Sequence, residues 1–138
     1  DPTSVITAGT IALPLDSDTF VSAGERGGIS YLYRKDLPHV RYGMDRDGRL
    51  HDVQLDGQDV PVRQLEEVLE DEGTHPASSE RTGVALTCGE DAVLRHILRS
   101  RLYSTLPVIV TNGDGRVLGL IDDPELINGI LEKRGQIP

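Results

Sequence analysis

The stretch that decides the fold is Thr105-Leu-Pro-Val-Ile-Val-Thr-Asn-Gly-Asp-Gly-Arg-Val-Leu-Gly-Leu-Ile121. Two apolar runs, Leu106–Val110 and Val117–Ile121, flank the turn Asn112–Gly115, whose residues tolerate positive φ angles. This pattern predicts a β-hairpin. Both runs are continuously apolar instead of alternating, so we expect the hairpin to be buried on both faces.

Helices are predicted on both sides of this hairpin. Before it, Thr87–Glu90 has the spacing of a capping box, and apolar residues follow at helical intervals (Val93, Leu94, Ile97 and Leu98). After it, Asp123 is expected to cap a helix, Pro124 suits the first helical position, and Gly135 is the expected stop. A short strand around Val84–Leu86 completes the order strand, helix, strand, strand, helix.

The first half of the chain partly repeats this pattern. Asp47-Gly-Arg-Leu50 matches Asp114-Gly-Arg-Val117 further along the chain and predicts a second hairpin over Tyr42–Val53. At the same sequence offset, Ser30–Lys35 aligns with Ile97–Arg101 and its neighbours, which are predicted to be helical. The alignment therefore predicts a helix at residues 30–35. A following helix is predicted from apolar residues at helical spacing (Val62, Leu65, Val68 and Leu69).

The order of elements predicts an α+β fold made of two β-α-β-β-α units that pack through their sheets. We place the first unit at residues 1–74, a polar linker at 75–81 and the second unit at 82–138. The repeat is too long for a solenoid and occurs only twice, which indicates a duplication. One unit has too little core to stand alone, so the two should share one.

Composition narrows the function classes. The 138 residues carry a net charge of −9, which disfavours binding to nucleic acid and to anionic membranes. The single cysteine, Cys88, cannot form an internal disulfide, which fits a reducing cytoplasm. No apolar run is long enough to span a membrane, and the first residues lack a signal-peptide pattern. Because the chain opens at Asp1, we expect it to be a piece of a longer protein.

The apolar strand after Leu106-Pro107, the Asp-Gly-Arg turn, the Gly119-Leu-Ile strand end and the capped helix together resemble the second half of a CBS (cystathionine β-synthase) domain. The first half is a more divergent match, and together they resemble a tandem CBS pair, or Bateman-type module, over nearly the whole chain. Val5-Ile-Thr-Ala-Gly-Thr-Ile11 is similar to the opening of the CBS pair in the ATP-binding subunits of glycine betaine, proline and choline ABC importers, and Tyr42-Gly43 is similar to that class too.

The resemblance implies a cytoplasmic regulatory sensor for osmoregulated quaternary-amine and amino-acid transport, which is not catalytic by itself. Its partners would be a second CBS pair in a homodimer, and the ATPase domain and membrane subunits of the importer. No phosphate loop of an ATPase occurs in this chain. The alternatives are an adenine-nucleotide sensor attached to another enzyme or channel, and a dimerisation module with decayed ligand sites. A small hydrolase is the least favoured interpretation.

The family's nucleotide site implies a Ser or Thr that contacts phosphate and an Asp three residues later that holds ribose. These positions are Asp122 and Glu125 here, and the resemblance adds a strand-end wall of five residues (Val84, Ala85, Leu106, Pro107 and Val108). AMP, ATP or cyclic di-AMP are the regulatory ligands to test. Asp122 would set a carboxylate where phosphate should bind, so a simple helix-capping role competes with ligand binding.

Other reactive side chains favour structural roles. The histidines are widely spaced, and none lies at metal-ligand spacing from another or from Cys88 (His39, His51, His75 and His96). Cys88 sits at a predicted helix start, where a thiolate is favoured, although a partly buried thiol is the commoner case. Asp16-Ser-Asp18 lacks further metal ligands, and a glycine cluster is expected to interrupt the first helix (Gly24, Gly27 and Gly28). We predict no catalytic residues and no metal site.

Overall fold

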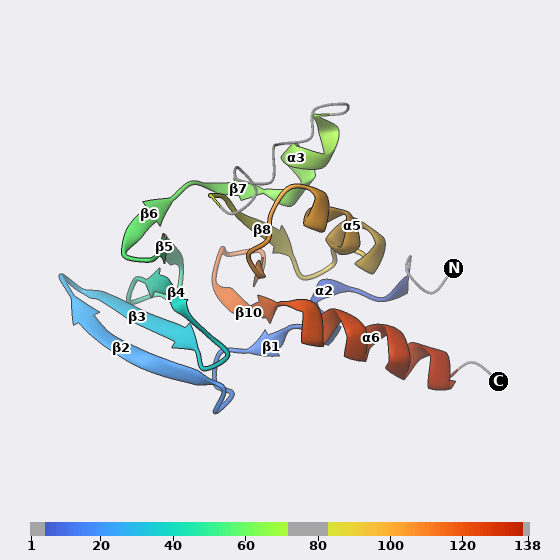
Figure 1. The fold of residues 1–138 in the computed structure, drawn as a ribbon, viewed down its shortest axis with the longest axis horizontal. Helices are drawn as coiled ribbons and strands as arrows, with labels where there is room; N and C mark the ends of the chain where they lie inside the picture. Colours follow the sequence, from blue (N-terminus) through green and yellow to red (C-terminus); the bar gives the residue numbers. More distant parts are fainter. Residues whose placement is uncertain (1–4, 72–82, 137–138) are drawn as a thin grey trace.

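The computed structural model describes residues 5–71 and 83–136 and has an α+β fold. Figure 1 shows the element order along the chain. The N-terminal part contains α2 Ala8–Ile11, β1 Leu13–Pro14, β2 Phe20–Arg26, β3 Ile29–Arg34, β4 Leu37–Met44, β5 Leu50–Leu55, β6 Gln58–Val60, β7 Val62–Gln64 and α3 Leu65–Glu70. The C-terminal part contains β8 Ala85–Gly89, α5 Leu94–Arg99, a 3-10 turn at Ser100–Leu102, β9 Val108–Thr111, β10 Val117–Ile121 and α6 Asp123–Gln136.

Two five-stranded sheets form the framework. One has the order β1-β10-β9-β8-β7, in which β7, β8 and β9 run parallel and the β9–β10 and β10–β1 pairs are antiparallel. The other is an antiparallel meander in chain order, β2-β3-β4-β5-β6. The first sheet therefore combines strands from both halves of the chain, whereas the meander comes from the first half alone.

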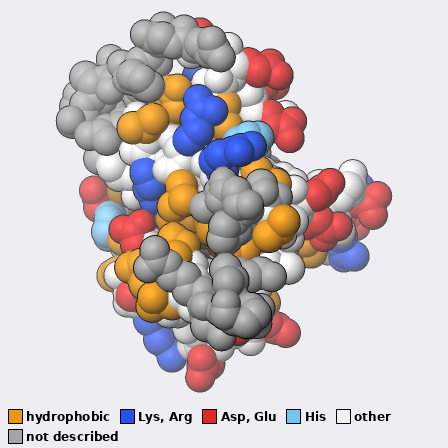
Figure 2. All heavy atoms as spheres, turned by 90° about the vertical axis from the view of Figure 1, so that its right-hand side faces the viewer, with side chains coloured by type: hydrophobic (Ala, Val, Ile, Leu, Met, Phe, Trp, Pro, Cys, Tyr) orange, Lys and Arg blue, Asp and Glu red, His pale blue; other side chains and the backbone are white. Residues whose placement is uncertain are grey.

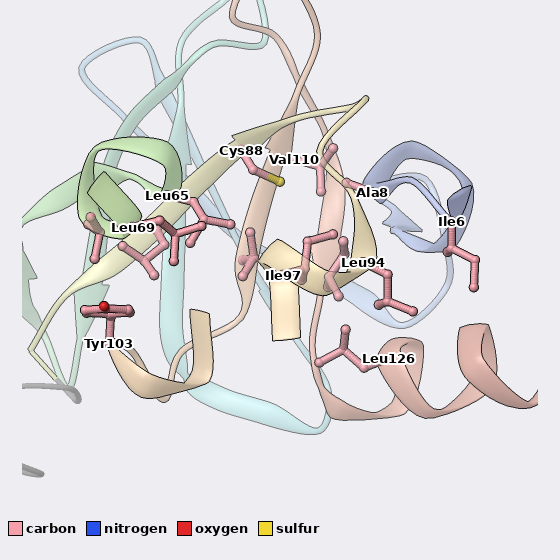
Figure 3. Packing of buried hydrophobic residues seen from close by; sticks show 14 residues of the cluster. Ile6, Ala8, Leu65, Leu69, Cys88, Leu94, Ile97, Tyr103, Val110 and Leu126 are labelled. Atoms are coloured by element: carbon pink, nitrogen blue, oxygen red, sulfur yellow. The ribbon is translucent and has the colours of Figure 1, made fainter. Parts of the chain in front are cut away.

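Two apolar cores divide the molecule into three layers. One core lies between the helices and the mixed sheet; Figure 3 shows Leu65, Leu94 and Leu126 from three helices packing with strand residues such as Val110. The other core lies between the two sheets and joins Val40, Tyr42, Met44 and Val53 of the meander to residues of the mixed sheet (Ala85, Ile109, Val117 and Leu120). The predicted burial of the β9–β10 hairpin on both faces is confirmed.

The two hairpins repeated in the sequence meet at their turns. An isolated antiparallel bridge joins Arg49 to Arg116. Arg49 Nε donates to the carbonyl of Asp114 at 2.8 Å, and Arg116 Nε donates to the carbonyl of Asp47 at 2.6 Å. The main-chain N–H of Val117 adds a bond of 2.9 Å to the carbonyl of Gly48. The repeated Asp-Gly-Arg motif thus corresponds to two turns in reciprocal contact.

The predicted helix at residues 30–35 is wrong, because this segment forms β3. Its assignment rested on the offset alone, whereas β3 is hydrogen-bonded on both sides, to β2 and to β4. The glycine cluster does not interrupt a helix either. Gly24 lies in β2, and Gly27 and Gly28 make the β2–β3 turn with φ angles of 60° and 82°. Left-handed backbone of this kind suits a tight strand connection.

Three helix boundaries also differ from the sequence prediction. The capping-box segment is the end of β8, and α5 begins only at Leu94, without a side-chain cap from Val93. Val62 belongs to β7 instead of the helix that starts at Leu65. α6 continues past Gly135 to Gln136. The strand near Val84–Leu86, both hairpins and α6 are confirmed, while the predicted linker at 75–81 lies outside the described residues.

Within the described ranges, no helix combines the length and the apolar character needed to cross a bilayer. On the face shown in Figure 2, acidic and basic side chains are interspersed with apolar groups.

Candidate functional site

The predicted ligand positions lie at the start of α6, directly after β10. The main-chain N–H of Asp122 donates to Glu125 Oε1 at 2.8 Å, and the N–H of Leu126 donates to the carbonyl of Asp122 at 3.1 Å. Asp122 is therefore the cap residue, one position before the expected Asp123. Glu125 acts as the acidic half of a capping box, because its carboxylate reaches back to the cap N–H.

The other predicted wall residues lie at the same end of the mixed sheet. Ala85 begins β8 and Val108 begins β9, while Leu106 and Pro107 lead into β9; all four are buried. Val108 pairs with Ile121, the residue before Asp122, so the structure brings these residues to one edge. Val84 is half-buried there, and its carbonyl accepts a bond of 2.7 Å from the Ser104 hydroxyl.

Arg34, which sequence reasoning missed, fixes Glu125. Its guanidinium is 2% exposed and donates from both Nη atoms to the two carboxylate oxygens of Glu125. The same guanidinium donates to Asp36, with Nε 3.0 Å from Oδ1. Burial lowers the pKa of Arg34, but the hydrogen bonds to Glu125 and Asp36 outweigh burial and raise it overall. A forked ion pair of this kind binds the meander to the start of α6.

Arg101 makes a second ion pair on the same helix start. Its Nη2 lies 3.1 Å from Asp122 Oδ1, its Nε lies 3.1 Å from Asp123 Oδ1, and its Nη1 donates to the carbonyl of Leu106 at 2.8 Å. Burial raises the pKa of Asp122, an effect that the Arg101 charge partly opposes. Two arginines thus already pair with the carboxylates at the start of α6.

Tyr42 brings an unsatisfied hydroxyl to this region. Its side chain is 1% exposed, and the hydroxyl has no hydrogen-bond partner in the part of the chain that the structure describes. Burial raises its pKa, and the charges of Asp122, Arg34 and Arg101 act on the same hydroxyl. A buried polar atom without a partner costs about 1–3 kcal/mol, so this hydroxyl is a local cost within the core between the two sheets.

Other candidate residues remain apart from this site. Cys88 lies in β8 and not at a helix start, and burial and then the charge of Glu66 raise its pKa to about 12. The interpretation as a buried thiol therefore holds. Among the described residues, no cluster of three or more acidic, histidine or cysteine side chains is arranged to hold a metal ion. His75 lies outside the described residues.

Comparison of the chain with protein-family models, with curated proteins and with solved structures found no match.

Proposed function

We propose that this chain is a regulatory module of the tandem CBS type, not catalytic by itself, which serves as the sensor region of the ATP-binding subunit of a quaternary-amine importer. The observation that carries the proposal is the reciprocal contact of the Asp47–Arg49 and Asp114–Arg116 turns, because duplicated hairpins packed about a shared sheet interface are expected of such a pair. The strand, helix, strand, strand, helix order of residues 85–136 also supports it.

The ion pairs at α6 suggest what the module senses. Arg101 and Asp122 are 24% and 20% exposed, and Asp123 is 74% exposed. Dissolved salt therefore screens the ion pairs of Arg101 with these two carboxylates. The Arg34–Glu125 pair is screened much less because Arg34 is buried. Rising ionic strength therefore weakens one attachment of α6 while the other holds. With one attachment weakened, α6 could shift relative to the mixed sheet. A shift of α6 would pass the change in ionic strength to an attached ATPase or to a second copy of the module.

Nucleotide sensing is the second candidate, and the Tyr42 hydroxyl favours it. A ligand that supplied a hydrogen-bond partner to this buried oxygen would relieve its desolvation cost. AMP, ATP or cyclic di-AMP would, however, have to draw Arg101 away from Asp122 and Asp123, since their phosphates need the same guanidinium. A module with decayed ligand sites would respond neither to nucleotide nor to salt.

A thermal-shift experiment separates these functions. For ionic sensing we expect a flat response to AMP, ATP and cyclic di-AMP and a salt-dependent melting temperature that Arg101→Gln largely removes. Arg99→Gln is the matched control, because Arg99 is exposed and close in sequence but forms no ion pair among the described residues. A shift of several degrees with a nucleotide would instead establish the second candidate. An equal salt response in both arginine variants contradicts ionic sensing through α6.

Asp122→Thr tests why phosphate is excluded. This substitution removes the carboxylate and restores the residue type that the resemblance expects at the position. If the Asp122 charge excludes phosphate, AMP should stabilise the variant more than the parent chain. Equal responses to AMP would show that the carboxylate is not the obstacle.

A further inference from the structure

The outer face of the meander contains an open hollow that the CBS resemblance does not explain. Its volume is about 80 Å³, and residues from three of the meander's strands and from the bulge in β2 line it (Ala23, Gly24, Glu25, Arg26, Tyr31, Arg41 and Gln54). Sites that enclose drug-sized molecules have volumes of roughly 300–1,000 Å³. The hollow therefore suits an ion or molecule of a few non-hydrogen atoms, and not a nucleotide.

An irregularity in β2 creates the hollow. The pairing of β2 with β3 shifts between Ser22 and Glu25, so that Ala23 and Gly24 together lie opposite Tyr31. Gly24 has a φ of 95°, and its N–H donates to the Ser22 hydroxyl at 3.2 Å. Bulges of this kind bend a strand and redirect its side chains, and they are common beside functional sites.

Hydrogen bonds to Asp52, on the neighbouring part of β5, hold two of the lining side chains. Asp52 accepts hydrogen bonds from Tyr31 Oη at 3.2 Å and Gln54 Nε2 at 3.1 Å, and its Oδ1 lies 2.9 Å from His51 Nδ1. Gly43 makes this convergence possible, because a Cβ there would lie 2.1 Å from Asp52 Oδ1 and 2.8 Å from the Tyr31 ring. The Tyr31 and Gln54 side chains are thus held in place before any ligand binds.

Two arginines give the hollow its charge. Arg26 and Arg41 are exposed, and neither forms an ion pair or a side-chain hydrogen bond with another described residue, although the chain carries a net charge of −9. Glu25 is the acidic residue among the lining side chains. Planar guanidinium groups match the geometry of phosphate and carboxylate oxygens. We propose that this hollow binds a small oxyanion, inorganic phosphate or a short carboxylate, between Arg26 and Arg41.

Binding of inorganic phosphate and of acetate to the whole chain, followed by NMR at constant ionic strength adjusted with chloride, tests this proposal. We expect saturable shifts at Gly24 and Tyr31, with tighter binding of phosphate. Arg26→Ala and Arg41→Ala should each weaken phosphate binding about tenfold, the loss of one charge-assisted hydrogen bond. Arg95→Ala, on the exposed side of α5, is the control and should bind like the parent chain.

Arg101→Gln separates this hollow from the α6 site, since phosphate captured at α6 would be lost in that variant only. Circular dichroism and melting temperature verify that each variant folds. Shifts that do not saturate, or equal phosphate affinity in the Arg26, Arg41 and Arg95 variants, would overturn the proposal. Saturable binding lost with Arg101→Gln alone would likewise overturn it and assign the anion to α6.

Discussion

The β4–β5 and β9–β10 hairpins have the same turn in different surroundings. Asp45 Oδ1 in one and Asn112 Oδ1 in the other each accept two main-chain N–H groups, at 2.9 and 3.0 Å. Gly48 and Gly115 follow with φ angles of 79° and 84°. The same few neighbouring residues therefore produce the same turn in both hairpins.

The hairpins differ in the strands next to the turn. Each has one glycine there, but it lies in the first strand of the β4–β5 hairpin and in the second strand of the β9–β10 hairpin. Gly43 of β4 faces Asp52, whereas Val110 of β9 faces Gly119 of β10. Gly43 makes room for the polar network on the outer face of the meander, and Gly119 makes room for the backbone of Leu13 in β1. Local sequence therefore sets the turn, while the residues on neighbouring strands of each sheet set the position of the glycine.

Among these glycines, Gly119 should tolerate substitution by alanine least. A Cβ there would lie 2.3 Å from the carbonyl oxygen of Leu13, a backbone atom that moves only with β1. We expect a loss of about 3 kcal/mol in the free energy of unfolding, measured by urea denaturation. Gly113→Ala is the control, because a Cβ there meets nothing within 4 Å. A Gly119 variant as stable as the control would show that β1 does not pack closely here.

Gly43→Ala should cost less, about 1–2 kcal/mol, because the groups it meets are side chains that can rotate away. The displaced Asp52 carboxylate would release the Tyr31 hydroxyl. Urea denaturation measures the stability, and the tyrosine absorbance change in a pH titration reports the hydroxyl. Burial and the Asp52 hydrogen bond raise the pKa of Tyr31, so it should fall in the variant. An unchanged titration contradicts this role of Gly43.

Gly48→Ala and Gly115→Ala should have equal effects, about 1 kcal/mol each, because both turns require the same left-handed backbone. Chemical denaturation of the two variants side by side provides the measurement. Clearly unequal losses of unfolding free energy would show that one turn carries strain that the other lacks.

The smallest effect concerns Cys88, which lies against the second hairpin through its pairing with Val110. Its pKa is about 12 in the fold and 9.0 ordinarily, so the unfolded chain loses the proton first. The stabilisation that comes from keeping the thiol neutral is fully present below the ordinary pKa of 9.0. It is lost as the pH rises through the folded-state pKa of about 12. At about pH 9 we expect the free energy of unfolding to fall by a few tenths of a kcal/mol from its value at neutral pH. Cys88→Ala should abolish this pH dependence in denaturation curves; the same slope without the thiol would assign it elsewhere.

Sequence reasoning succeeded where the information is local. The β9–β10 hairpin and the acidic start of α6 follow from continuous apolar runs, turn residues and cap residues that lie side by side in the chain. It failed for β3, which was assigned by offset although its neighbours on both sides are strands. It also missed Arg34, because its partner Glu125 is 91 residues away and no spacing rule links them.

The order of the mixed sheet has a consequence for modularity. Both of its edge strands, β1 and β7, come from the first half of the chain, while β8, β9 and β10 fill the interior. A gene fragment that encoded only residues 83–136 would leave the main-chain groups of β8 and β10 unpaired on two open edges, which promote aggregation. The two halves therefore form one folding unit, and a truncation or a recombination breakpoint between them should cost the fold of the C-terminal part.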